Sequence, residues 1–189
     1  MPIEAATSVF ECSMDRLMRM VAASEEFQTM VGAVATEGVT VEAAALNHVF
    51  YPDVLHGLDA STDPPRAIVD DVEGSYVSRL LGLDTRAYDR SLNVVLELVV
   101  PDDDISDVSI WLRTHAQRRY AMNRFGTIIE EMLALSGTGV SVAGETHLFL
   151  SGITIEAGPA MLSPEEIEQE SDATLDGHYF VVLNVELGN

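Results

Sequence analysis

Apolar residues recur at helical spacing near the start of the chain. Between residues 7 and 23 they lie three or four positions apart, on one face of a predicted helix. That face comprises Phe10, Met14, Leu17, Met18 and Val21. A shorter helix is predicted to follow, with Ser24 as its N-cap, two glutamates in its first turn and Gly32 at its end. Thr40 is a further candidate N-cap, for one or two helical turns over 41–47.

Alternating apolar residues then predict strands. A short strand is predicted over 48–51, and a longer one over 66–73 that ends in an acidic turn. The clearest strand covers 91–100, where apolar residues at every second position line one face and Pro101 ends the run. The stretch 75–90 leaves two alternatives open, because its apolar residues suit either a hairpin arm or a cover over the sheet.

The longest helix is predicted over about 107–136, with Gly137 just past its end. Its predicted buried stripe is Val108, Trp111, Leu112, His115, Met122, Phe125, Ile129, Met132 and Leu133. Two more strands are predicted over 147–156 and 178–187, and the second is apolar on both faces at its start, as a central strand would be. An acidic insertion over about 158–177 separates these two strands.

The order of elements predicts an α+β fold. We expect one mostly antiparallel sheet of about four to six strands, packed by the N-terminal helix and the long helix between the strand groups. The chain has 189 residues and is 47% hydrophobic. At this length a domain buries roughly 70% of its unfolded surface, so we expect a single domain over 1–189. We expect no membrane span, because no apolar run approaches about 20 residues. We expect no secretion signal, because the N-terminal residues lack a basic region followed by an apolar stretch.

The lack of Lys and the presence of a single Cys exclude several kinds of catalytic and metal site. All ten basic residues are Arg, which excludes Lys-dependent phosphate loops and Schiff bases. Cys12 is the single cysteine, so neither an internal disulfide nor a Cys-rich zinc site holds the fold together. Cys12 lies in an apolar-periodic segment and is interpreted as a small core residue.

The net charge of −21, with acids retained and Lys absent, resembles the composition of proteins from extreme halophiles. At 1 M salt the Debye length falls to about 3 Å, which screens most of the self-repulsion of such a chain. We therefore expect the protein to be stable only in concentrated salt. An ordinary acidic protein that happens to lack Lys is the alternative.

Candidate catalytic and metal-binding motifs are weak. Residues 103–107 match the DDxxD pattern of magnesium–diphosphate sites, but here they open a helix, where carboxylates favour the positive end of the dipole. Asp70, Asp71 and Glu73 are interpreted as solvated surface. His147 and His178 open the two late strands and would be neighbours only in a parallel pairing. We therefore expect no enzyme activity, no cofactor and no metal requirement.

One segment differs in charge from the rest. From Val108 to Ile129 there are four Arg and no acid, while the flanking segments are net negative. These candidate subunit-interface residues are Arg113, Arg118, Arg119 and Arg124. Arg pairs bidentately with carboxylates, so this face either is solvated or meets the acidic surface of another copy. Four Arg on so acidic a chain make a poor platform for DNA, and we expect no sequence-specific nucleic-acid binding.

Together these features resemble the tail terminators, or tail-completion proteins, of long-tailed phages and archaeal viruses. The resemblance rests on the Ala22–Gln28 end of the first helix, the strand at Pro65–Val69, the strand ending at Pro101, the long helix ending IIEEMLALSG, the Ile153–Pro159 strand and the closing Glu186-Leu187-Gly188. Proteins of this family are small α+β subunits that form a ring, usually sixfold, between the tail tube and the head connector.

The resemblance implies a structural virion protein at the head–tail junction, assembled in the host cytoplasm. Its implied partners are copies of itself in a ring, by the family's usual pattern a hexamer, together with the tail tube protein and the head connector proteins. A negative lumen would let DNA pass without sticking, since like charge disfavours phosphate contact. Two alternatives stay open: another neck component, either a largely helical adaptor or a β-barrel closure protein, and a small cytoplasmic enzyme or regulator.

Overall fold

A computed structural model describes residues 9–51, 64–71, 77–80, 86–100, 110–135, 149–161 and 177–188. Its N-terminal helices are α1 (Val9–Ala23), α2 (Glu25–Met30) and α3 (Val41–Leu46), and the long helix is α5 (Ile110–Leu135). Its strands are β1 (Val49–Phe50), β2 (Arg66–Asp71), β3 (Val77–Leu80), β4 (Arg86–Val100), β5 (Phe149–Met161) and β6 (Gly177–Gly188).

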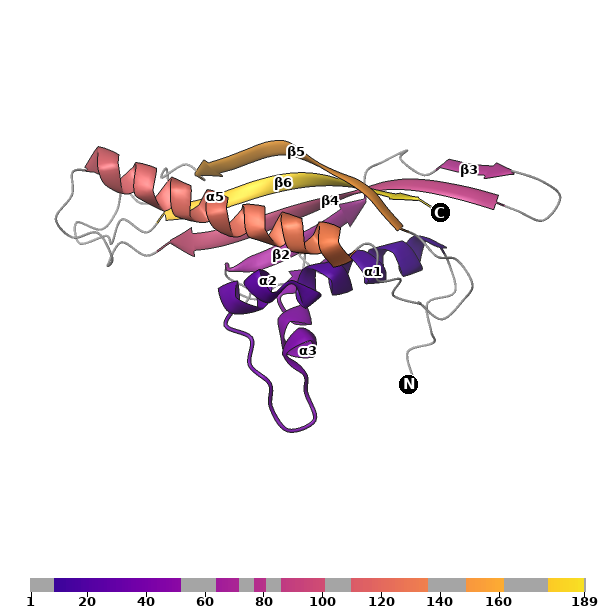
Figure 1. The fold of residues 1–189 in the computed structure, drawn as a ribbon, viewed down its shortest axis with the longest axis horizontal. Coiled ribbons are helices and arrows are strands. Elements are labelled where there is room, and N and C mark those ends of the chain that lie inside the picture. The colour runs from indigo at the N-terminus through magenta and orange to yellow at the C-terminus, as the bar shows by residue number, and fades with distance from the viewer. Residues whose placement is uncertain are drawn as a thin grey trace.

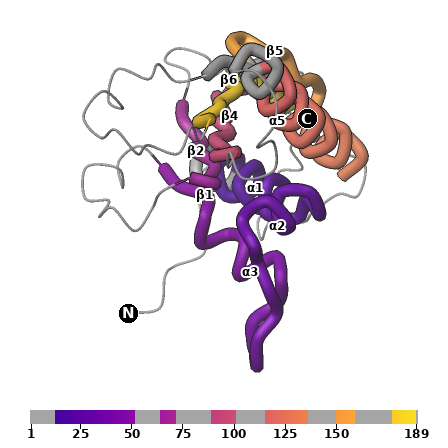
Figure 2. Tube along the Cα trace, turned by 90° about the vertical axis from the view of Figure 1, so that its left-hand side faces the viewer, coloured from indigo at the N-terminus to yellow at the C-terminus, as the bar shows by residue number. Residues whose placement is uncertain are grey.

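The described strands form one mixed sheet in the order β1-β2-β4-β6-β5 (Figure 1). The β1–β2 pair is parallel, and the other pairs are antiparallel. The helices α1 and α5 pack on the sheet from one side, α1 against β1 and β2 and α5 against β4, β5 and β6 (Figure 2). The predicted α+β fold with a mostly antiparallel sheet is therefore confirmed.

The core lies between this helical layer and the inner face of the sheet. Alternate residues of β4 and β6 point into it, including Leu92, Leu96 and Leu183, which are fully buried. From the helices come Leu17 of α1 and Phe125 of α5, both within 1% of complete burial. β6 lies between β4 and β5, and its inner-face residues are buried, whereas Phe180 and Val182 on its outer face are half-buried.

Local signals predicted the small helices correctly. The Ser24 side chain caps α2 by accepting the Phe27 N–H at 3.0 Å, and Thr40 caps α3 by accepting the Ala43 N–H at 3.2 Å. Gly32 follows α2 with a φ of +65°, a conformation that glycine adopts without strain.

The segment 75–90 forms a hairpin arm rather than a cover. Its described part contains β3, which pairs antiparallel with residues 86–89 of β4. β4 therefore begins at Arg86, five residues before the predicted start of the strand at Ser91. Charged residues in this arm hide the alternation, which explains the late predicted start.

The long helix is present, but part of its predicted stripe is wrong. His115, Met122 and Leu133 are exposed, whereas Phe125 and Met132 are buried as predicted. The face of the helix that packs on the sheet also contains three buried residues outside the predicted stripe, Gln117, Ala121 and Ile128. The side chains of Val108, Trp111 and Leu112 lie outside the described residues.

The parallel pairing that would make His147 and His178 neighbours is not present. β5 and β6 are antiparallel, with Phe149 opposite Gly188, so His178 lies near the far end of that pairing. β5 continues to Met161, so residues 158–161 belong to a strand and not to the acidic insertion. Residues 162–176, the DDxxD match at 103–107, Glu73, His147 and the Cys12 side chain lie outside the described residues.

Candidate interaction surfaces

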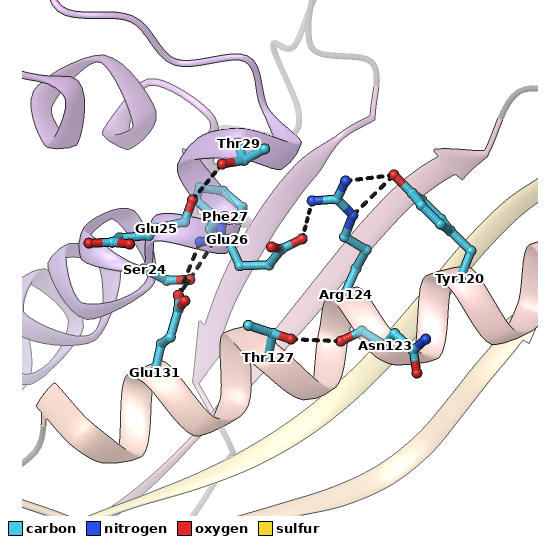
Figure 3. A network of polar contacts seen from close by, with 10 residues as sticks. All are labelled: Ser24, Glu25, Glu26, Phe27, Thr29, Tyr120, Asn123, Arg124, Thr127 and Glu131. Atoms are coloured by element: carbon cyan, nitrogen blue, oxygen red, sulfur yellow. Dashed lines mark hydrogen bonds and ion pairs between the residues drawn. The ribbon is translucent and has the colours of Figure 1, made fainter.

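A polar network joins α2 to α5 (Figure 3). The Glu131 carboxylate accepts the Ser24 hydroxyl at 2.6 Å and the Glu26 backbone N–H at 3.0 Å. It thus lies at the N-terminus of α2, where negative charge is favourable. Ser24 is fully buried, so its hydroxyl both receives the cap bond and donates to Glu131.

The same contact region holds Arg124. Its guanidinium pairs with Glu26, donates to the Tyr120 hydroxyl at 2.7 and 3.0 Å, and lies 5.0 Å from the centre of the Tyr120 ring (Figure 3). Partial burial acts to lower the pKa of Arg124, but the hydrogen bonds to Glu26 and Tyr120 outweigh it and raise the pKa. Arg124 therefore has partners within its own chain.

Removing the Ser24 hydroxyl should cost more than removing an ordinary helix cap. We expect Ser24→Ala to lower the free energy of unfolding by about 1–2 kcal/mol, because the Phe27 N–H and Glu131 both lose a buried partner. The matched control is Thr40→Ala, an exposed cap, with an expected loss of about 0.5–1 kcal/mol. Urea unfolding at constant KCl measures both losses, and an equal loss in the two variants would contradict the role of Glu131.

Two of the four candidate interface arginines are exposed on α5. Arg118 and Arg119 both lie on the part of the helix that faces away from the core. Arg118 approaches the start of β6 closely enough to act on Tyr179, where burial raises the pKa of the phenol and the Arg118 charge opposes that effect. The Arg113 side chain lies outside the described residues.

Large exposed apolar side chains accompany this charge. Met122 and Leu133 on α5 and Ile155 on β5 are 47%, 43% and 53% exposed. The remaining large exposed apolar residues of the described chain are Tyr120 on α5 and Val34 and Val39 between α2 and α3. Exposed apolar side chains mark an interaction site where they gather on one surface.

Two further arginines join elements of the sheet and its helical layer, and they were not predicted from the sequence. Arg90 of β4 is 2% exposed and donates to Asp71 and to Ser13 of α1. On the other face of the sheet, Arg66 donates to Glu97 at 2.6 Å, and His178 lies 3.8 Å from the same carboxylate. Only the register of β2, β4 and β6 brings these groups together, which the sequence does not display.

Within the described residues, no three His, Cys, Asp or Glu side chains gather as metal ligands. No described helix is both long and apolar enough to cross a membrane. No family model matches the chain, and no curated protein matches it.

Proposed function

We propose that the chain is a ring-forming structural subunit at the head–tail junction of a tailed virus, where it caps the tail tube and joins it to the head connector. The observation that carries this proposal is the outer surface of α5. It presents exposed Arg118 and Arg119 together with exposed Met122 and Leu133, outside the helix–sheet core. A subunit that works alone gains nothing from such a surface, whereas a subunit of a ring buries it.

The balance of helix and strand supports the terminator over other neck components. Of the described residues, about 44% are helical and 43% are in strands. A largely helical adaptor and a β-barrel closure protein would each depart from this balance. The acidic remainder of the chain also suits a ring that DNA traverses, since like charge keeps phosphates from sticking.

The proposal predicts a closed ring, most simply a hexamer, for the purified protein in 3 M KCl. Light scattering after gel filtration measures the mass, and negative-stain electron microscopy shows whether the particles have a central opening. The gene should also lie near genes for capsid, portal and tail tube proteins. Addition of the ring to the neighbouring tube protein during its polymerisation should stop tube growth.

A protein that stays monomeric at high concentration in 3 M KCl would contradict the proposal. Rings that leave tube length unchanged would contradict the capping role while leaving the assembly intact. A gene surrounded by metabolic genes would favour the enzyme or regulator instead.

A further inference from the structure

The segment between α2 and α3 forms a projecting finger together with the first two residues of α3, and the finger is defined here as residues 32–42. Within it Thr36 and Val39 exchange two backbone hydrogen bonds, of 3.1 and 3.0 Å, around a tight turn. Gly38 occupies this turn with a φ of +80°, which explains why glycine is needed there. The finger points away from the sheet in both views (Figures 1 and 2).

The finger exposes apolar side chains where a free loop would carry polar ones. Val34 is 68% exposed and Val39 is 40% exposed. Glu37 and Glu42 are exposed beside them, and the sequence has no Arg or Lys from Met20 to Pro65. The finger is thus an ordered apolar tip whose charged side chains are all negative.

The second surface runs along the flank of α5 that faces away from α2. Helical spacing places the exposed residues Arg118, Met122 and Leu133 on one stripe, and Arg119 lies next to it. Ile129 lies between this stripe and the core, and it packs against the core. Ile155 belongs to the same side of the sheet, because it pairs with Leu183, whose side chain is buried beneath the helices. We call Arg118, Arg119, Met122, Leu133 and Ile155 the α5–β5 surface.

A neighbouring molecule can approach this surface closely. Gly126 lies between Met122 and Leu133 along the helix, and a Cβ added there would meet no atom within 4 Å. β5 is the last strand of the described sheet, so its outer edge adds unpaired backbone groups to the surface.

The charges indicate that the molecule that binds the α5–β5 surface is a second copy of this chain. Most of the sequence is acidic, so contacts between two copies generally repel each other. The α5–β5 surface is an exception, since α5 has no acid before Glu130 and carries exposed Arg118 and Arg119. The finger itself carries two exposed carboxylates and no cation, and Glu42 also acts on Arg19 of its own α1. Its apolar side chains suit the apolar stripe.

The two surfaces lie at opposite ends of the molecule. The finger extends beyond α2 and α3 at the bottom of both views, and β5 lies at the top, on the far side of the sheet (Figures 1 and 2). A finger therefore does not reach the α5–β5 surface of its own chain. Two different, complementary surfaces on opposite sides give a head-to-tail contact, which closes into a ring when the rotation allows.

We propose that the finger of each subunit docks on the α5–β5 surface of the next, with Val34 and Val39 against Met122, Leu133 and Ile155, and Glu37 and Glu42 paired with Arg118 and Arg119. This contact is the subunit boundary of the ring proposed above, and the inference rests on that proposal. Short-range ion pairs and apolar contacts persist in salt that screens long-range repulsion.

Charge reversal on each surface tests the contact. We expect Arg118→Glu/Arg119→Glu and Glu37→Arg/Glu42→Arg each to raise the subunit dissociation constant about 100-fold or more and to leave monomers. An equimolar mixture of the two variants should assemble again, because each wild-type finger meets a wild-type α5–β5 surface and each reversed finger meets a reversed one. All four changes in one chain should restore rings as well.

Matched controls change charge elsewhere on the exposed surface. Asp70→Arg and Asp89→Arg each reverse an exposed acid on the sheet, the first on β2 and the second on β4. Both controls should assemble within about threefold of wild type. Circular dichroism of every variant at 3 M KCl checks that the monomer is folded.

The outcomes separate this contact from the ring itself. If wild type forms rings and the charge-reversed variants also form them, the contact is wrong while the ring stands. If each variant is monomeric but the mixture stays monomeric, the two surfaces do not meet each other and the contact is again wrong. This last result would be expected if either surface bound the tube protein instead. A monomeric wild type overturns both proposals.

Discussion

The unfolding midpoint should rise by about 10–20 °C when KCl is raised from 0.1 to 3 M. The structure places acids such as Glu42, Glu130 and Glu156 on the surface, and the whole chain carries −21. Two like charges 10 Å apart in water repel by about 0.4 kcal/mol without salt and by about 0.15 kcal/mol at 0.1 M, where the Debye length is about 10 Å. Roughly thirty such pairs therefore cost about 5 kcal/mol at 0.1 M salt. For a domain of this size each 1 kcal/mol shifts the midpoint by about 2–4 °C.

A variant with fewer surface charges separates screening from other effects of salt. Asp89→Asn, Glu130→Gln, Glu156→Gln and Glu186→Gln remove four exposed charges outside the finger and the α5–β5 surface. The combined variant should be more stable than wild type at 0.1 M KCl and should gain less from added salt. Scanning calorimetry of both proteins measures the two midpoints. Equal wild-type midpoints at 0.1 and 3 M, or a higher one at low salt, would contradict the interpretation as a halophilic protein.

Local chemistry explains what the sequence predicted correctly. The caps of α2 and α3 depend on Ser24 and Thr40, whose side chains bond to backbone N–H groups three residues away. The strand over 91–100 depends on alternation within one segment. Such features involve neighbours in sequence, so one sequence by itself displays them.

The long helix shows why the rest could not be predicted. α5 carries two adjacent apolar stripes, one through Phe125 and Met132 and one through Met122 and Leu133. Both fit the helical period, and their separation is smaller than the width of an ordinary buried face. The first stripe is the one that packs on the sheet, and Ala121 and Gln117 are buried beside it. Because Ala121 is small and Gln117 is polar, neither marks the buried face in the sequence.

The candidate interface was predictable in part. Arg118 and Arg119 lie in a segment that has basic residues and no acidic ones, and both are exposed in the structure. The same segment includes Arg124, which pairs with Glu26 of its own chain. That pair joins residues 98 positions apart, so only the packing of α2 on α5 creates it. The finger was not singled out, although its two glycines indicate tight turns and its exposed valines are unusual for such a segment.

The two stripes of α5 should differ sharply in their contribution to stability. Phe125 is 1% exposed at the centre of the core, so we expect Phe125→Ala to lower the free energy of unfolding by about 3–5 kcal/mol. Met122, three residues earlier, is 47% exposed, so Met122→Ala should change it by no more than about 0.5 kcal/mol. The two variants are matched controls for each other, because both remove a large apolar side chain from the same turn of the helix.

The measurement belongs in the Arg118→Glu/Arg119→Glu background, where assembly does not add to the apparent stability of the monomer. Urea unfolding at 3 M KCl gives both values. In the wild-type background Met122→Ala should instead weaken subunit association, by about tenfold, because it truncates a contact of the α5–β5 surface. A large loss of monomer stability in Met122→Ala would show that the stripe predicted from the sequence is the buried one. In that case the α5–β5 surface would belong to the core and would not be open to a second copy.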